Sequence, residues 1–160
     1  MLVLADTNIL LRLLATTDPQ HALVRQAVRA IRTRGDKLLA APQIAAEFWN
    51  VCTRPATARG GFGLTIPEAD RRLRIIERIF PIRSDHPGAY PIWRALVVAH
   101  AVSGVQVHDA RLVAFMLAHG VSHILTFNGP DFARFPGITP IAPASLAPSA
   151  SSTPPSPGTP

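Results

Sequence analysis

Cysteine, lysine and long apolar runs are all scarce in this chain of 160 residues. A single cysteine, Cys52, excludes an internal disulfide framework and is typical of a reducing compartment. No apolar stretch approaches the roughly 20 residues that cross a bilayer, and Asp6 interrupts the first apolar run after five residues. We therefore expect a soluble, cytoplasmic protein with no signal peptide and no membrane partner.

Positive charge is in excess, and arginine supplies nearly all of it. The formal net charge is +6, and Lys37 is the only lysine. Such a charge favours an anionic partner such as nucleic acid, and the spacing of Arg25, Arg29 and Arg32 places them on one helix face as a candidate track for phosphates. Abundant arginine, alanine and proline also reflect a GC-rich coding sequence. The charge alone is therefore only modest support for a nucleic-acid partner.

The chain divides into one folded domain and a tail. Residues 143–160 are rich in Pro, Ser, Thr and Ala and carry no charge, so they cannot bury enough apolar surface to offset the entropy of ordering. We predict a disordered tail there and a single domain over residues 1–142, a normal size for one hydrophobic core.

Strand and helix patterns alternate along residues 1–142. The apolar run 2–5 predicts a strand that is buried on both faces. Asp18 and Pro19 are good residues for a helix start, as N-cap and first helical residue. The full set comprises strands at 2–5, 38–40, 80–82, 123–127 and 138–141, and helices at 7–15, 19–35, 42–53, 67–79, 90–103 and 109–119. This alternation predicts a three-layer α/β/α sandwich with a mostly parallel central sheet.

Three carboxylates lie within apolar surroundings: Asp6, Glu47 and Asp109. A buried charge without a partner is destabilising, and three acids cannot neutralise one another. A divalent cation such as Mg²⁺ would satisfy them, and a hard cation held by carboxylates points to phosphate chemistry. Each acid also has a simpler interpretation, because Asp6 and Asp109 can cap helices and Glu47 can pair with a loop arginine.

Polar residues at the same predicted sheet edge extend this candidate site. Asn128 leaves the 123–127 strand at its carboxyl end, where ligands of parallel sheets bind. Thr7 and Asn8 can orient carboxylates or a water, although helix capping explains them equally well. Arg12 is the arginine that we rank first for contact with an RNA or protein partner.

Four segments together resemble the PIN domain family, and within it the VapC-type toxin ribonucleases of bacterial toxin–antitoxin pairs. They are LADTNIL at residues 4–10, AEFWNV at 46–51, HDARL at 108–112 and LTFNGPDF at 125–132. Each segment alone is a weak signal, whereas four in this order and spacing are fairly specific.

The resemblance implies a PIN-like fold and an endoribonuclease that uses Mg²⁺ or Mn²⁺, with a cognate antitoxin and homodimer formation as further expectations. Asp6, Glu47 and Asp109 match three family acids, whereas Asn128 occupies the position of the fourth. Asn128 is placed with the catalytic set. Asp131 either supplies the missing carboxylate as a metal ligand or caps a short turn over residues 132–135, which we favour.

Two other interpretations compete with a nuclease. One is an RNA-binding module that has lost catalysis, which the neutral Asn128 supports and the three retained acids oppose. The other is a HAD-type phosphatase, which also places an aspartate after its first strand. That chemistry requires a second acid two residues later and a lysine downstream, and neither Asn8 nor Lys37 fits those requirements.

Overall fold

Four short parallel strands form the central sheet, in the order β2-β1-β3-β4. The structure is a computed structural model that describes residues 1–58 and 60–147. The strands are β1 (Leu2–Ala5), β2 (Lys37–Leu39), β3 (His123–Leu125) and β4 (Thr139–Ile141). The predicted α/β class and the parallel sheet are therefore confirmed.

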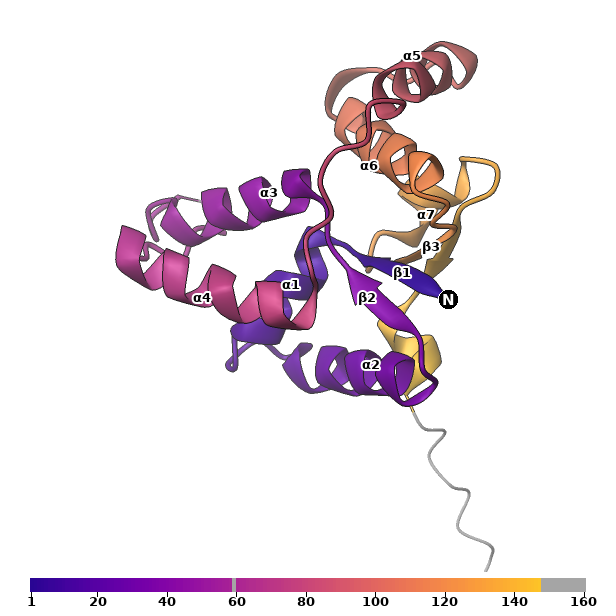
Figure 1. The fold of residues 1–160 in the computed structure, drawn as a ribbon. Helices are drawn as coiled ribbons and strands as arrows, with labels where there is room; N and C mark the ends of the chain where they lie inside the picture. Colours follow the sequence, from indigo (N-terminus) through magenta and orange to yellow (C-terminus); the bar gives the residue numbers. More distant parts are fainter. Residues whose placement is uncertain (59, 148–160) are drawn as a thin grey trace, which may run out of the picture.

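Helices flank this sheet. They are α1 (Thr7–Leu14), α2 (His21–Thr33), α3 (Pro42–Thr53), α4 (Ile66–Ile79), α5 (Ala89–Ala99), α6 (Val107–Ala118) and α7 (Gly129–Ala133), with 3-10 turns η1 (Gly104–Gln106) and η2 (Pro143–Leu146). In the view of Figure 1, α2 lies below the sheet and α6 above it, while the pairs α3–α4 and α5–α6 project in different directions.

The sheet is buried because its strands are apolar on both faces. Val3, Leu4 and Ala5 are fully buried, as are Ile124 and Leu125 in the neighbouring strand. This burial explains why these strands have continuous apolar runs rather than alternating polar residues. Cys52 is also fully buried.

The predicted helix start at Asp18 and Pro19 is wrong. Asp18 Oδ1 accepts a hydrogen bond from the Gln20 backbone N–H at 2.7 Å, which forms a turn, and α2 begins only at His21. The side chain of Asp18 thus stabilises the connection between α1 and α2 and does not cap α2.

Other predicted elements are shortened. The segment at 80–82 contributes one parallel bridge, between Ala40 and Ile82, instead of a strand. The helix expected over 90–103 ends at Ala99, and Ala101 beyond it has a φ of 48°, which ends helical geometry. The next helix begins at Val107, two residues before Asp109.

The predicted start of the disordered tail is also wrong. Residues 143–146 form the 3-10 turn η2, in which Pro143 is buried and Leu146 packs against the core. This turn contacts α2, so packing against a helix orders a segment whose composition suggested disorder. Residues 148–160 of the predicted tail lie outside the described residues.

Within the described residues, none of the helices combines the length and the apolar character needed to cross a membrane.

Candidate metal centre

The carboxyl ends of β1 and β3 meet at the centre of the sheet. The strand order places β2 on one side of β1 and β3 on the other, and ligands of parallel sheets bind where the order reverses in this way. Asp6 follows β1, and its backbone N–H donates to the Leu125 carbonyl at 3.0 Å. Thr126 follows β3, so both side chains lie at this reversal point.

Asp6 is 7% exposed and hydrogen-bonded through both oxygens. Oδ1 accepts from the Thr7 backbone N–H at 2.6 Å, which caps α1. Oδ2 accepts from Asn8 Nδ2 at 2.6 Å and from Thr126 Oγ1 at 2.5 Å. The capping interpretation of Asp6 is therefore correct, and two further polar groups, from Asn8 and Thr126, converge on the same side chain from two segments of the chain.

Glu47 reaches the same region from α3. Its Oε2 accepts from Thr7 Oγ1 at 2.5 Å, and its Oε1 accepts from Gln43 Nε2 at 2.8 Å. Thr7 thus contacts both acids, through its backbone N–H to Asp6 and through its hydroxyl to Glu47. This geometry suits a residue that orients carboxylates.

Burial and neighbouring acids destabilise the charged forms of Asp6 and Asp109. Burial raises the pKa of Asp6 from 3.8 to about 6, with smaller contributions from Glu47 and Asp109, against the lowering effect of the hydrogen bonds from Thr126 and Thr7. The pKa of Asp109 is also raised, by burial first and then by the charges of Asp131 and Glu47. His108 and Arg134 oppose that rise.

None of the three acids forms an ion pair with an arginine or lysine of the described residues. The salt bridge that we considered for Glu47 is therefore not formed with them. Asp109 is not a cap either, since it lies within the first turn of α6, after the N-cap Gln106. The three acids are thus grouped by their electrostatic interactions, and none forms an ion pair within residues 1–58 and 60–147.

The donor set fits an open Mg²⁺ or Mn²⁺ site rather than a closed one. In the part of the chain that the structure describes, no group of three or more His, Cys, Asp or Glu side chains is arranged so that it could hold a metal ion. Mg²⁺ binds to one or two carboxylates, keeps several waters and takes the remaining ligands from phosphate oxygens. The set Asp6, Glu47 and Asp109 offers oxygen ligands only, and the pKa values of Asp6 and Asp109 are raised, so the set is suited to such an ion.

The segment after β3 positions two further candidates. Asn128 is exposed at the N-cap of α7, and its backbone N–H donates to Thr126 Oγ1 at 2.9 Å. Asp131 lies inside the first turn of α7 instead of capping a turn at 132–135, so the capping interpretation that we favoured is wrong. Its charge raises the pKa of Asp109, which places Asp131 at the edge of the acid group.

Arg12 is held by protein contacts. Its guanidinium lies over the ring of Phe127, 4.7 Å from the centroid, and Nη1 donates to the Asn8 carbonyl at 3.1 Å. Its Nε is 4.0 Å from Asp18 Oδ2. Contact of Arg12 with a partner stays a prediction. Arg25, Arg29 and Arg32 are exposed on α2.

Sequence reasoning missed two residues of the site, Thr126 and Gln43. Gln43 lies four residues before Glu47 on the same helix, a spacing that places two side chains on one face and that would have found it. Thr126 could be found only through the adjacency of β1 and β3, because 120 residues separate it from Asp6.

The sequence model of the PIN domain family matches residues 3–138. A search of curated protein sequences finds no match. The resemblance noted in the four segments is thus supported over nearly the whole domain.

Solved structures of toxin–antitoxin proteins have the same fold. FitAcB from Neisseria gonorrhoeae superposes with a TM-score of 0.64 at 15% identity, covering 90% of this chain and 99% of that one. VapBC2 from Rickettsia felis, bound to promoter DNA, gives 0.62 at 12% identity, with 89% and 98% covered. VapC20 from Mycobacterium tuberculosis, a Sarcin-Ricin loop cleaving toxin, gives 0.59 at 16% identity, with 82% and 93% covered.

Proposed function

The chain belongs to the PIN domain family, and on that premise we propose that it is a metal-dependent endoribonuclease, the toxin of a toxin–antitoxin pair. One observation carries the proposal: burial, with the charge of Glu47 as a smaller cause, raises the pKa values of Asp6 and Asp109 at the carboxyl edge of the sheet, and none of the three acids forms an ion pair with an arginine or lysine of the described residues. The structurally similar VapC20, an RNA-loop cleaving toxin, supports RNA as the substrate.

The residues of this chain orient the acids for phosphodiester hydrolysis. Thr126 and Asn8 hold Asp6 Oδ2, while Thr7 and Gln43 hold the two oxygens of Glu47. Asp109 accepts no hydrogen bond from a described residue, so its oxygens are available to a ligand. Bound Mg²⁺ or Mn²⁺ would supply an acidified water for in-line attack on the scissile phosphate and offset the charge that develops there.

The test is cleavage of total cellular RNA with and without Mg²⁺ or Mn²⁺, followed by mapping of the new 5′ and 3′ ends. We expect cleavage that a chelator stops and that Asp6→Asn abolishes. Asp70→Asn is the matched control, because Asp70 is on the surface of α4 and pairs only with Arg74. An Asp6→Asn protein that still cleaves would refute the proposal, and wild-type binding of RNA without cleavage would favour the non-catalytic module.

The phosphatase alternative is disfavoured by the position of the lysine. Lys37 pairs with Leu2 in the sheet register, at the strand ends opposite to Asp6, and it is exposed. Asn8 meanwhile donates a hydrogen bond to Asp6 instead of providing a second acid. The structure thus gives neither of the two groups that this reaction requires.

An antitoxin partner is supported by a structural neighbour, a toxin–antitoxin complex from Klebsiella pneumoniae. The partly buried apolar residues Phe62 and Leu64 line one cavity, whereas Trp93 lines another. Phe62 and Leu64 line an open cavity of about 270 Å³ with Leu14 and Arg72, and this is the surface that we assign to an antitoxin helix. Co-purification with the product of an adjacent reading frame, weakened by Leu64→Arg, tests the assignment.

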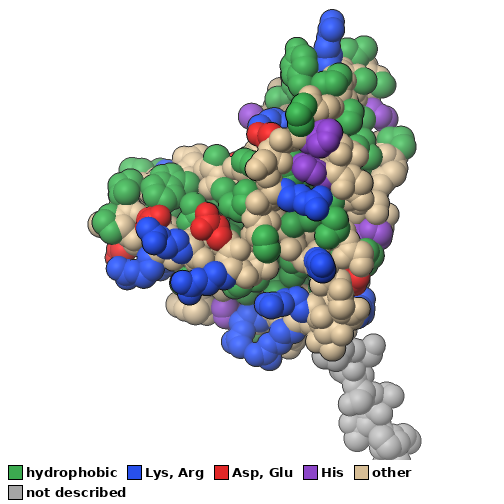
Figure 2. All heavy atoms as spheres, in the orientation of Figure 1, with side chains coloured by type: hydrophobic (Ala, Val, Ile, Leu, Met, Phe, Trp, Pro, Cys, Tyr) green, Lys and Arg blue, Asp and Glu red, His purple; other side chains and the backbone are tan. Residues whose placement is uncertain are grey.

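Homodimer formation and the basic RNA surface are further parts of the proposal. On the face drawn in Figure 2, Lys and Arg side chains gather around α2 and α4, whereas hydrophobic side chains dominate the α5–α6 projection. A monomer mass at micromolar concentration would refute the dimer. If the affinity for RNA does not fall with rising salt, the proposal that this basic surface binds RNA phosphates is refuted.

A further inference from the structure

A cavity of about 420 Å³ lies beside the acid group, between the start of α3, the segment before α5, and helices α5 and α6. None of the three acids lines this cavity, and Asp131 does not line it either. Its walls combine one line of polar side chains with one aromatic face, and it touches the candidate metal centre through a single side chain.

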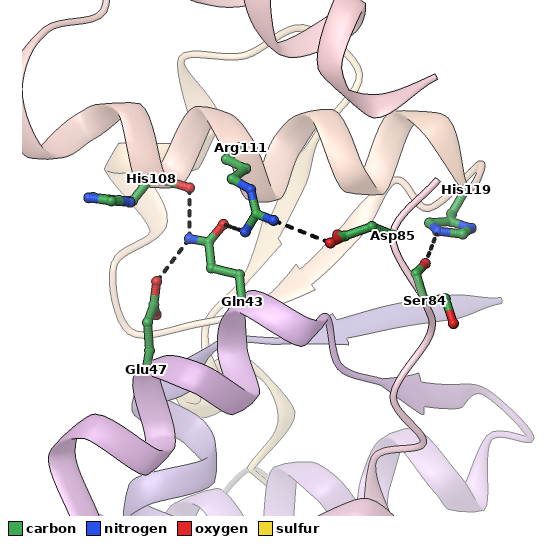
Figure 3. A network of polar contacts seen from close by, with 7 residues as sticks. All are labelled: Gln43, Glu47, Ser84, Asp85, His108, Arg111 and His119. Carbon is green, nitrogen blue, oxygen red and sulfur yellow. Dashed lines mark hydrogen bonds and ion pairs between the residues drawn. The ribbon is translucent and has the colours of Figure 1, made fainter. Parts of the chain in front are cut away.

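The polar wall is a chain of hydrogen bonds that Figure 3 shows. Arg111 Nη1 donates to Gln43 Oε1 at 2.9 Å, and Arg111 Nη2 contacts Asp85 Oδ2 at 3.3 Å. The side chains of Arg111 and Asp85 are 48% and 55% exposed, so their ion pair is weak and a ligand can replace it. The wall therefore offers donors and an acceptor to a bound molecule.

Gln43 joins this wall to the candidate metal centre. It is 9% exposed, and its Nε2 donates to Glu47 Oε1 at 2.8 Å and to the His108 carbonyl at 3.1 Å. Glu47 belongs to the acid group, and His108 directly precedes Asp109. A molecule that contacts Gln43 from the cavity is thus one side chain away from Glu47.

The opposite wall is aromatic and open to solvent. Tyr90 is 68% exposed, and its ring centroid lies 5.9 Å from that of the half-buried Trp93, with an angle of 33° between the rings. Trp93 is anchored by a hydrogen bond from Nε1 to the Val107 carbonyl at 3.2 Å, and Phe115 lines the cavity with them. Flat aromatic rings next to solvent are suited to stacking on a planar ligand.

We propose that this cavity binds one unstacked nucleobase of the RNA substrate, adjacent to the scissile phosphate. Single-stranded and looped RNA is recognised by stacking splayed bases on aromatic rings and arginine and by hydrogen bonds to base edges. Tyr90 and Trp93 provide the stacking surface, and Arg111 and Asp85 provide the donors and acceptor for the base edge. The proposal rests on the nuclease function in one respect, namely that the bound base belongs to a substrate.

The test measures base binding without cleavage. In a Trp49→Phe background Trp93 is the only tryptophan, so its fluorescence reports the cavity. The four ribonucleoside 5′-monophosphates are titrated in chelator. We expect saturable quenching that Tyr90→Ala weakens at least about fivefold, since stacking contributes on the order of 1–3 kcal/mol per base. Arg111→Met should weaken the binding as well.

Two exposed positions of α5 outside the cavity provide matched controls, Val98→Ala and Arg94→Met. They should bind nucleotides like the parent, and circular dichroism checks that all variants fold. The cavity variants should raise the KM for RNA cleavage more than they lower kcat, because they leave the acids in place.

The proposal is refuted if no nucleotide quenches Trp93, or if neither cavity variant binds more weakly than its control. The proposal is also refuted if the parent protein binds no nucleotide and Tyr90→Ala loses a co-purifying protein partner. That result would identify a protein as the occupant of the cavity. The nuclease function is refuted by a different result. If the protein binds nucleotides in chelator but cleaves no RNA with Mg²⁺ or Mn²⁺, the cavity assignment stands and the nuclease proposal is wrong.

Discussion

Replacing Asp6 by asparagine should make the metal-free protein increasingly stable relative to wild type as the pH rises, even though the replacement removes a proposed catalytic group. Burial raises the pKa of Asp6 from 3.8 to about 6. The folded state therefore binds more protons than the unfolded state between these two values, so the free energy of unfolding falls as the pH rises through this window. The destabilisation is absent below pH 3.8 and complete above about pH 6.

The size of the effect follows from the pKa values. A rise from 3.8 to about 6 corresponds to about 3 kcal/mol at 1.36 kcal/mol per pKa unit. Asparagine does not titrate, so the difference in unfolding free energy between Asp6→Asn and wild type should increase by about this amount from acidic to alkaline pH. Because the new amide also faces the Asn8 amide, a pH-independent offset of either sign accompanies this change.

Urea unfolding in chelator, followed by circular dichroism at pH 4 and pH 8, measures that difference by linear extrapolation. Asp70→Asn is the control, since it makes the same replacement on the surface of α4. If the difference between Asp6→Asn and wild type is the same at both pH values, the carboxyl of Asp6 is not destabilised by burial. The electrostatic case for a cation at this site would then fail.

Three further outcomes test the site and the core. Mg²⁺ at 100 times its dissociation constant should raise the unfolding free energy of wild type by about 2.7 kcal/mol at pH 8. The rise for Asp6→Asn should be much smaller, and thermal shift measurements can compare the two proteins. Equal shifts would exclude Asp6 as a ligand. Thr126→Val removes the hydroxyl that donates to Asp6 and accepts from Asn128, and should lower Mg²⁺ affinity by about 10- to 100-fold in a calorimetric titration, whereas Thr126→Ser should retain most of it. Phe48→Ala should cost about 3–5 kcal/mol in urea unfolding because Phe48 is fully buried, and a loss below 1 kcal/mol would contradict the core assignment.

Local signals in the sequence were sufficient for the fold class, and they singled out the three acids as candidates for the site. The strand at Leu2–Ala5 is recognisable because a continuous apolar run has few alternatives to a doubly covered strand. Glu47 was noticeable because it lies on an apolar helix face, where an acid has no local role. Helix α3 was predicted with the observed bounds, since Pro42 suits a helix start.

Predictions that depended on a choice between two local roles were less successful. Asp18 and Asp131 are both good capping residues, but the caps lie elsewhere, because the chain between neighbouring elements has to meet a fixed geometry. Residues 143–146 have the composition of a disordered segment, yet α2 provides a surface on which they pack.

The sequence by itself determined that the chain forms a parallel α/β domain and that three of its acids lie in apolar surroundings, because both properties follow from residue patterns within one or two turns of chain. Only the tertiary structure decided which groups surround those acids. The pairing of β1 with β3 brings Thr126 to Asp6, and the packing of α5 on α6 creates the aromatic cavity beside Gln43. Such contacts join residues far apart in the chain, and local preferences contain no information about which distant segments will meet.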